Sequence, residues 1–110
     1  MNERIKEETK MKITNVTVNL LKGDYRVRAF AAFTIDDDFV VHGAKVIDGN
    51  KGLFVAMPQE TNYNEETGEK EFLDICHPIN TETRNKITKA VLDAYWDLLD
   101  KENDDEGYSE

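Results

Sequence analysis

The sequence predicts an α+β fold, in which an antiparallel-rich sheet of about five strands is followed by one C-terminal helix. Three observations carry this prediction. Apolar and polar residues alternate from Lys12 onward, as they do in half-buried strands. Short polar turns separate the alternating segments, which favours antiparallel hairpins. From about Thr81 to Leu99 the apolar spacing changes to that of a helix.

Length and composition favour one compact domain. The chain has 110 residues, of which 39% are hydrophobic and 34% charged, enough for one core under a highly charged surface. A domain of this size leaves much of its surface uncovered, so we expect a homodimer. The expected divisions are a disordered leader over residues 1–10, a folded domain over 11–99 and an acidic disordered tail over 100–110.

The first two predicted strands have the clearest alternation. Val16, Val18 and Leu20 share one face of the first strand, which ends at a turn over residues 22–24. In the second strand, over residues 25–36, one parity is apolar throughout: Tyr25, Val27, Ala29, Ala31, Phe33 and Ile35. Because the connection is short, we expect the two strands to be antiparallel neighbours.

Residues 39–57 predict two further strands. The polar run Asp36–Asp38 is the expected turn before residues 39–49, where Gly43 indicates a bulge. Residues 53–57, LFVAM, are apolar on both parities, which is typical of a strand covered on both faces and so interior to its sheet. After Pro58, residues 59–71 are expected to form a polar loop, and KEFLDIC a short fifth strand.

The last predicted element is a helix that is capped by Asn80 or Thr81 and ends near Leu99. Its core-facing stripe is formed by Ile87, Ala90, Val91, Ala94 and Leu98. Leu92, Trp96 and Leu99 widen the apolar surface beyond what packing on one sheet requires. We expect these three residues at a dimer interface; the alternative is that they cover the end of their own sheet.

Charge and cysteine content exclude several classes of protein. The net charge of −9 argues against the diffuse cationic field of a nonspecific DNA-binding protein, so any nucleic-acid contact needs a local basic patch. A single cysteine, Cys76, allows no intrachain disulfide. The first ten residues are charged, and no run approaches the ~18 apolar residues that a membrane-spanning helix needs. We therefore expect a cytoplasmic protein without membrane contact.

Motif content predicts no catalytic residues, no cofactor, no metal and no small-molecule substrate. The chain has no Gly-rich phosphate loop, no GxSxG and no HExxH, so we expect it not to be an enzyme. Asp36–Asp38 is interpreted as a solvated turn, because an EF-hand needs acidic residues at alternate positions. Cys76, His77 and His42 are too few for structural zinc, which generally takes four ligands.

Two local groups of basic residues are candidate nucleic-acid contacts: Arg26 and Arg28 on a strand, and Arg84, Lys86 and Lys89 in the first turns of the helix. Cations at a helix N-terminus oppose the macrodipole, so something other than helix stability can explain the second group. A phosphate there would meet backbone N–H groups and side-chain cations together. The alternative interpretation is a solvated polar face on the side away from the core.

Three stretches of the chain resemble the stage V sporulation protein G (SpoVG, septation protein) family. They are MKITNVTVNLLKGD, AFAAFTIDDDFVVHGAKVIDGNKGLFVAMP and HPINTETRNKITKAVLDAY, and the resemblance runs from Met11 to about Leu99. It implies a small cytoplasmic α+β dimer that binds DNA and RNA and is linked to septation, sporulation and gene regulation. It also implies a nucleic-acid region formed by the loop after Met57-Pro58 together with the helix.

The chain departs from the family pattern in that loop. Family members usually have a basic stretch directly after Met-Pro, whereas residues 59–63 are Gln-Glu-Thr-Asn-Tyr, and four more glutamates follow by residue 71. Anions there repel phosphate. Each lost phosphate contact reduces the slope of log affinity against log salt concentration, which we call the salt slope, by roughly one unit. Either the contacts move to the five basic residues named above, or this chain binds a different partner.

Two functions remain as hypotheses. The first is a homodimeric DNA- and RNA-binding regulator of septation and sporulation genes, with phosphate contacts from the helix start and the strand arginines. The second is a protein-interaction module whose acidic loop and tail meet a basic partner, without direct contact to nucleic acid. A gel-shift series across salt concentrations separates the two.

Overall fold

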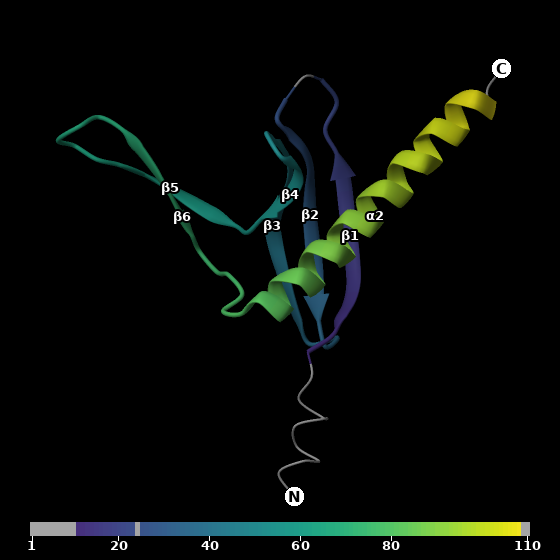
Figure 1. The fold of residues 1–110 in the computed structure, drawn as a ribbon, viewed down its shortest axis with the longest axis horizontal. Helices are drawn as coiled ribbons and strands as arrows, with labels where there is room; N and C mark the ends of the chain where they lie inside the picture. Colours follow the sequence, from purple (N-terminus) through teal and green to yellow (C-terminus); the bar gives the residue numbers. More distant parts are fainter. Residues whose placement is uncertain (1–10, 24, 109–110) are drawn as a thin grey trace, which may run out of the picture.

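The computed structural model describes residues 11–23 and 25–108, with side chains in the helix as far as Glu102. The described residues form six strands and one long helix, which are β1 (Ile13–Leu20), β2 (Val27–Ile35), β3 (Phe39–Gly49), β4 (Gly52–Ala56), β5 (Gln59–Tyr63), β6 (Lys70–Asp74) and α2 (Thr81–Tyr108). β1 to β4 form one antiparallel sheet in chain order, and β5 with β6 forms a separate antiparallel pair (Figure 1). The α+β prediction is confirmed.

The core lies between α2 and one face of the four-stranded sheet, which the helix crosses (Figure 1). Small side chains line this face, since Ala29, Ala31 and Ala44 are at most 4% exposed and Ala31 pairs directly with Ala44. Larger buried side chains complete the core, namely Phe33, Val46, Val55, Met57, Ile87, Val91 and Tyr95. The three from the helix are spaced by four residues, so they lie on one stripe. The alanines leave room for the helix to approach the sheet.

The turn and bulge predicted around β3 are both present. Asp36 and Asp37 have φ of 53° and 60°, and the Asp38 N–H donates to the Ile35 carbonyl at 2.9 Å. Two positive φ values with that hydrogen bond define a type I′ turn, whose backbone twist matches the twist of the flanking strands. Gly43 has φ 91°, and the register between β2 and β3 shifts beside it, which confirms the bulge.

β4 lies at the edge of the sheet, so the prediction that residues 53–57 form an interior strand is wrong. The apolar residues on the two faces of β4 have different surroundings. Val55 is buried in the core under the helix, whereas Phe54 is 46% exposed on the opposite face of the sheet. The residues of β4 that face away from the helix are therefore apolar because an aromatic side chain is exposed there, and not because a second layer covers that face of the sheet.

The segment that follows β4 is a β-hairpin and not the polar loop predicted over residues 59–71. β5 and β6 pair from Gln59 opposite Asp74 to Tyr63 opposite Lys70, and every residue of both strands is exposed. We call this hairpin, residues 59–74, the arm; it stands away from the main sheet (Figure 1). Strand periodicity is absent from its sequence because neither face is buried. The fold thus has six strands in two sheets where one sheet of about five was expected.

The helix begins as predicted and ends later than predicted. The Asn80 Oδ1 accepts a hydrogen bond of 2.7 Å from the Thr83 N–H, so Asn80 is the N-cap. α2 runs to Tyr108 instead of ending near Leu99, so the predicted end of the helix is wrong, and the acidic disordered tail over residues 100–110 stays a prediction. Residues 100–106 lack apolar side chains but also lack any Gly or Pro that would break a helix. The leader predicted over residues 1–10 lies outside the described residues.

The arm and the end of α2 extend the molecule. The Cα radius of gyration is 17.1 Å, whereas a compact domain of this length is expected near roughly 13 Å. In the part of the chain that the structure describes, no helix is long and apolar enough to cross a membrane.

Candidate nucleic-acid interface

The two strand arginines lie beside one acidic residue, at the end of the sheet where β2 begins. The Arg28 Nη2 is 3.3 Å from the Asp48 Oδ2, and the Arg26 Nε donates to the Asp48 carbonyl oxygen at 3.4 Å. Both contacts are long, and the side chains of the ion pair are 37% and 46% exposed. The guanidinium groups therefore stay accessible to a phosphate in solution.

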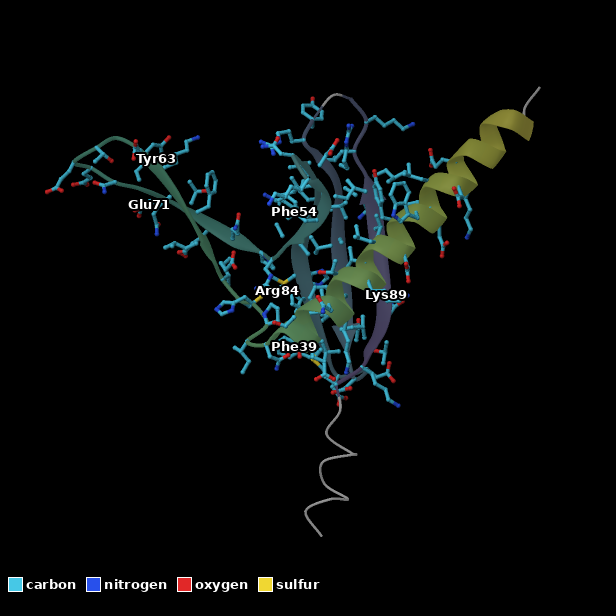
Figure 2. The ribbon with its side chains drawn as sticks, viewed as in Figure 1. Phe39, Phe54, Tyr63, Glu71, Arg84 and Lys89 are labelled. Carbon is cyan, nitrogen blue, oxygen red and sulfur yellow. The ribbon has the colours of Figure 1, made fainter. Side chains whose placement is uncertain are left out.

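The three cations at the helix start differ in how much of their bonding capacity is free. Arg84 is exposed and forms no ion pair with any described side chain. The Lys86 Nζ donates at 2.9 Å to the Met11 carbonyl oxygen, so this side chain ties the helix to the chain before β1. Lys89 pairs with Asp93 across one turn of the helix at 2.8 Å. Of these three cations, only the Arg84 side chain forms no ion pair or hydrogen bond with a described residue. Figure 2 labels Arg84 at the start of α2.

The pair on the helix also changes the acid–base behaviour of Lys89. A hydrogen bond from the lysine to the Asp93 carboxylate, helped by the negative charge of that carboxylate, raises the pKa of Lys89 above its ordinary value of 10.5. The lysine is therefore protonated at neutral pH, and Asp93 cancels its charge locally. A phosphate that approaches this side chain has to compete with a carboxylate already in contact.

The structure does not bring the two predicted groups together. Arg26 precedes β2, whereas Lys86 contacts Met11, which precedes β1, and the first residue of β1 pairs with Ile35 at the far end of β2. β2 has nine residues, which separates its two ends by roughly 25 Å at the usual rise of a strand. The strand arginines and the helix start are thus two separate cationic points.

Acidic residues lie close to the second of these points. The Asp36 Oδ1 accepts a hydrogen bond of 2.9 Å from the Lys12 N–H, one residue after the carbonyl that Lys86 contacts. The aspartates of the β2–β3 turn therefore occupy the same end of the sheet as the helix start. Their field opposes phosphate binding there, over a range of about 8 Å at physiological salt.

The three residues predicted at a dimer interface have different surroundings. Leu92 and Leu99 are half-buried and pack against the core of their own chain, in agreement with the alternative interpretation for those two. Trp96 is 51% exposed, and its ring meets the Tyr95 ring edge-on at a centroid distance of 5.3 Å. It stays a prediction that the three residues pack between two chains. Trp96 has the largest exposed surface available for such a contact.

An apolar groove that sequence reasoning missed lies between the start of β3, the base of the arm and the first turn of α2. Its volume is about 750 Å³, and its exposed apolar side chains include Phe39, Ile75 and Ile79, of which Ile79 is 89% exposed. His42, Cys76 and His77 also line it. The residues come from three segments without periodic spacing, so no local pattern could indicate that they share a surface. Among the described residues, no group of three His, Cys, Asp or Glu side chains is placed to hold a metal ion.

The arm occupies the position in which the family resemblance places nucleic-acid contacts. It carries six acidic residues and one basic residue, Lys70, whose Nζ lies 5.8 Å from the centre of the Tyr63 ring. Tyr63, Phe72 and Leu73 are exposed on it, and Figure 2 shows Tyr63 and Glu71 far from the main sheet. The arm is therefore an acidic and partly aromatic projection, and its charge repels phosphate.

The sequence of this chain is similar to that of named proteins. The model of the SpoVG family matches residues 11–97. A "putative septation protein SpoVG" of Bacillus subtilis is 50% identical over 92 residues, which cover 84% of this chain and 90% of that protein. Proteins of the same name from Caldanaerobacter subterraneus and Bacillus velezensis are 51% identical over 85 residues and 50% identical over 92 residues. These matches cover 77% and 84% of this chain, and 88% and 90% of the respective relatives.

Proposed function

This chain belongs to the SpoVG family, and from that premise we propose that it acts in septation and sporulation as a homodimeric regulator that binds DNA and RNA. The relatives are named for septation, and this chain is similar to them over most of its length. Nucleic-acid binding and dimerisation are proposed here from the charge and surface of the molecule itself.

The observation that carries the proposal is the exposed guanidinium group of Arg84 at the start of α2. It forms no ion pair with a described side chain, whereas neighbouring Lys86 and Lys89 are engaged by Met11 and Asp93. A guanidinium beside the first turn of a helix suits a phosphate, because the group donates two parallel hydrogen bonds and the helix terminus is positive.

The distribution of charge supports the same proposal. Residues 11–58, which hold the main sheet, contain six basic and five acidic residues, although the whole chain has a net charge of −9. The excess of acid lies in the arm and in residues 100–110. A phosphate can therefore meet the sheet and the helix start without crossing the most negative parts of the molecule.

A second copy supplies what one chain lacks. One chain offers two cationic points near opposite ends of β2, which lie roughly 25 Å apart. A two-fold dimer doubles these points, so that several phosphates of one polymer can be bound together. Exposed apolar surface also supports dimerisation. Trp96 is half-exposed, and the arm is an isolated two-stranded pair, which is marginally stable in water without a partner.

The test is a fluorescence-anisotropy titration of the full chain with labelled 20-mers, both duplex and single-stranded, at several salt concentrations. We expect binding that weakens steeply with salt. The double variant Arg26→Glu, Arg84→Glu should lose most of the affinity, because each phosphate contact accounts for roughly 0.9 of the salt slope on duplex DNA. The control is Lys101→Glu, which changes an exposed cation far along α2.

Two results would contradict the proposal. Wild-type protein that binds neither DNA nor RNA at physiological salt defeats nucleic-acid binding altogether. Full affinity in the double arginine variant defeats the assignment of Arg26 and Arg84. Light scattering on the same samples tests the dimer separately, with two chains per particle as the expected result.

The arm favours a second candidate function, a protein-interaction module for a basic partner. Its exposed Tyr63 and Phe72 are aromatic residues of the kind enriched at protein interfaces, and its exposed acids suit a partner of opposite charge. One double variant distinguishes the two proposals. Glu65→Lys with Glu66→Lys should strengthen nucleic-acid binding under the first proposal, because it removes repulsion. Under the second proposal neither wild type nor variant binds nucleic acid at physiological salt.

A further inference from the structure

The face of the main sheet opposite the helix carries two exposed phenylalanines with a lysine between them. The strand registers place Phe30, Lys45 and Ala56 side by side across β2, β3 and β4. Phe54 lies in the neighbouring row, opposite Ile47. Phe30 is 42% exposed and Phe54 46% exposed, so neither ring belongs to the core. We call Phe30, Lys45, Ile47, Phe54 and Ala56 the open face.

The ring of Phe54 rests against the backbone of the sheet. A Cβ atom at Gly49 would lie only 2.8 Å from the Phe54 Cε1, closer than real contacts allow, so the absence of a side chain at Gly49 makes room for the ring. Beside it is a hollow of about 380 Å³, lined by residues that include Gly49, Lys51 and Phe54. An aromatic ring held in this way is ordered before any ligand arrives, which lowers the entropy lost on binding.

The charge of this region is positive although the chain is acidic. The four strands of the main sheet contain a single acidic residue, Asp48, and that carboxylate already contacts Arg28. Lys45 lies in the open face itself, and Lys51 lines the hollow beside Phe54. The open face therefore offers aromatic rings and uncompensated ammonium groups together.

We infer that the open face stacks the bases of single-stranded nucleic acid, with Phe30 and Phe54 beneath two bases and Lys45 and Lys51 on the intervening phosphates. This rests on the proposed function and adds to it the class of ligand and a second site, apart from the helix start. Every base has a π-face, so such stacking tolerates many sequences. A duplex hides those faces in its own stack, which makes the site selective for single strands.

The spacing of the rings agrees with this assignment. Phe30 and Phe54 lie two strands and one row apart, which is roughly 12 Å between Cα atoms at the usual spacings of a sheet. Each ring can therefore take its own base, and Lys45 lies between the two. Flat sheets with exposed aromatic side chains use this arrangement to bind unpaired bases.

A second copy of this chain is a poorer occupant of the open face. In a two-fold contact each surface meets itself, so Lys45 would be buried near the Lys45 of the other copy. Within the open face no carboxylate is present to neutralise the two ammonium groups. Burial of unpaired charges is costly, whereas a phosphate backbone neutralises them.

The test compares three phenylalanine variants of the full chain, with fluorescein-labelled 12-mers of oligo-dT, oligo-U and a mixed-sequence duplex as probes. Loss of one stacked base should weaken single-strand binding by about 5- to 150-fold, so this is the effect expected for Phe54→Ala and for Phe30→Ala. Duplex binding should change by less than about twofold, because the phosphate contacts remain. The matched control is Phe72→Ala, a ring on the arm that is 62% exposed.

Two further variants keep the result interpretable. Phe54→Leu retains an apolar side chain of similar size without the ring, so it should fold as the wild type does and still bind single strands more weakly. Lys45→Gln should lower the salt slope on single strands by roughly 0.7, the contribution of one phosphate. Circular dichroism and light scattering of each variant report folding and the number of chains per particle.

Three outcomes would overturn the inference, and they differ from one another. If wild type binds single strands and Phe54→Leu binds them equally well, the open face is not the site, while the proposed function stands. If wild type binds no nucleic acid, both fail together. If Phe54→Leu converts a dimer into monomers, the open face is an interface between copies.

Discussion

The Nζ of Lys86 donates a hydrogen bond of 2.9 Å to the carbonyl oxygen of Met11, 75 residues earlier in the chain. The bond joins the second turn of α2 to the segment that leads into β1, the edge strand under the helix. Lys86 was predicted to bind phosphate, but in the folded chain it first serves to anchor the helix. Its contribution to stability can therefore be measured apart from any contribution to binding.

We expect Lys86→Met to lower the free energy of unfolding by about 1–2 kcal/mol, the usual cost of losing a hydrogen bond from a charged donor. Methionine keeps most of the aliphatic stem, so packing changes little. Urea unfolding followed by circular dichroism gives the value. Lys101→Met, an exposed lysine on the same helix, is the control. Equal stability of the two variants would show that the bond to Met11 contributes nothing.

The β2–β3 turn offers a stabilising substitution. Asp37 has φ 60°, a left-handed conformation that costs roughly 1–2 kcal/mol for a residue with a Cβ atom and little for glycine. Asp37→Gly should therefore raise the free energy of unfolding by about 0.5–1 kcal/mol, after the greater freedom of glycine in the unfolded chain is subtracted. The Asp37 N–H still reaches the Thr14 Oγ1 in this variant, because the bond uses the backbone.

Asp38→Gly is the control for that turn. Asp38 is absent from the residues with positive φ, so glycine relieves no strain there and should only destabilise. Thermal unfolding of the two variants should move in opposite directions. A lower midpoint for Asp37→Gly than for wild type would contradict the type I′ assignment.

Phe33 and Phe30 lie on the same strand and on opposite faces of the sheet, and they should respond very differently to truncation. Phe33 is 2% exposed and Phe30 42% exposed. Phe33→Ala should cost about 3–5 kcal/mol, because it leaves a cavity between sheet and helix. Phe30→Ala should cost less than about 1 kcal/mol. Chemical unfolding of both variants measures the difference, and similar costs would mean that Phe30 is covered in solution.

The pair between Lys89 and Asp93 should make part of the helix stability dependent on pH. The folded pKa of Lys89 lies above the ordinary 10.5, so the stabilising contribution is complete below about pH 10 and is lost as the pH rises through the raised pKa. Asp93→Asn should return the pKa toward 10.5, which NMR titration of the Lys89 side chain can follow. The stability difference between wild type and Asp93→Asn should shrink in strongly alkaline solution.

Asp97→Asn is the matched control for that titration, since Asp97 is an exposed aspartate one turn further along and forms no ion pair with a described side chain. It should leave the pKa of Lys89 almost unchanged. A shift as large as that caused by Asp93→Asn would show that the general charge of the helix, and not the 2.8 Å contact, raises the pKa.

Local patterns predicted the elements that bury one face. The alternation of Val16 with Val18 and the stripe through Ile87 and Val91 both correspond to elements of the structure. The sequence offered Asn80 or Thr81 as the cap, and the structure selects Asn80. The arm could not be predicted in this way, because both of its faces are exposed and its ladder is made by backbone groups that every residue has.

The candidate site was only partly predictable for a related reason. Composition identified all five basic residues, but their availability depends on partners distant in sequence, such as Asp48 for Arg28 and Met11 for Lys86. The open face was hidden because Phe54 lies in an apolar run, and an apolar run looks the same whether its second face is buried or exposed.

By itself, the sequence determined the order of five of the six strands and the helix, the turn at Asp36–Asp38, the bulge at Gly43 and the family to which the chain belongs. Each of these is encoded in neighbouring residues, in their period or in stretches of matching sequence. Only the tertiary structure decided that β4 is an edge strand, that the arm stands apart and that the basic residues form two separate points. Those features are set by contacts between residues that are far apart in the chain, and the free energy of such contacts appears only when the fold brings the partners together.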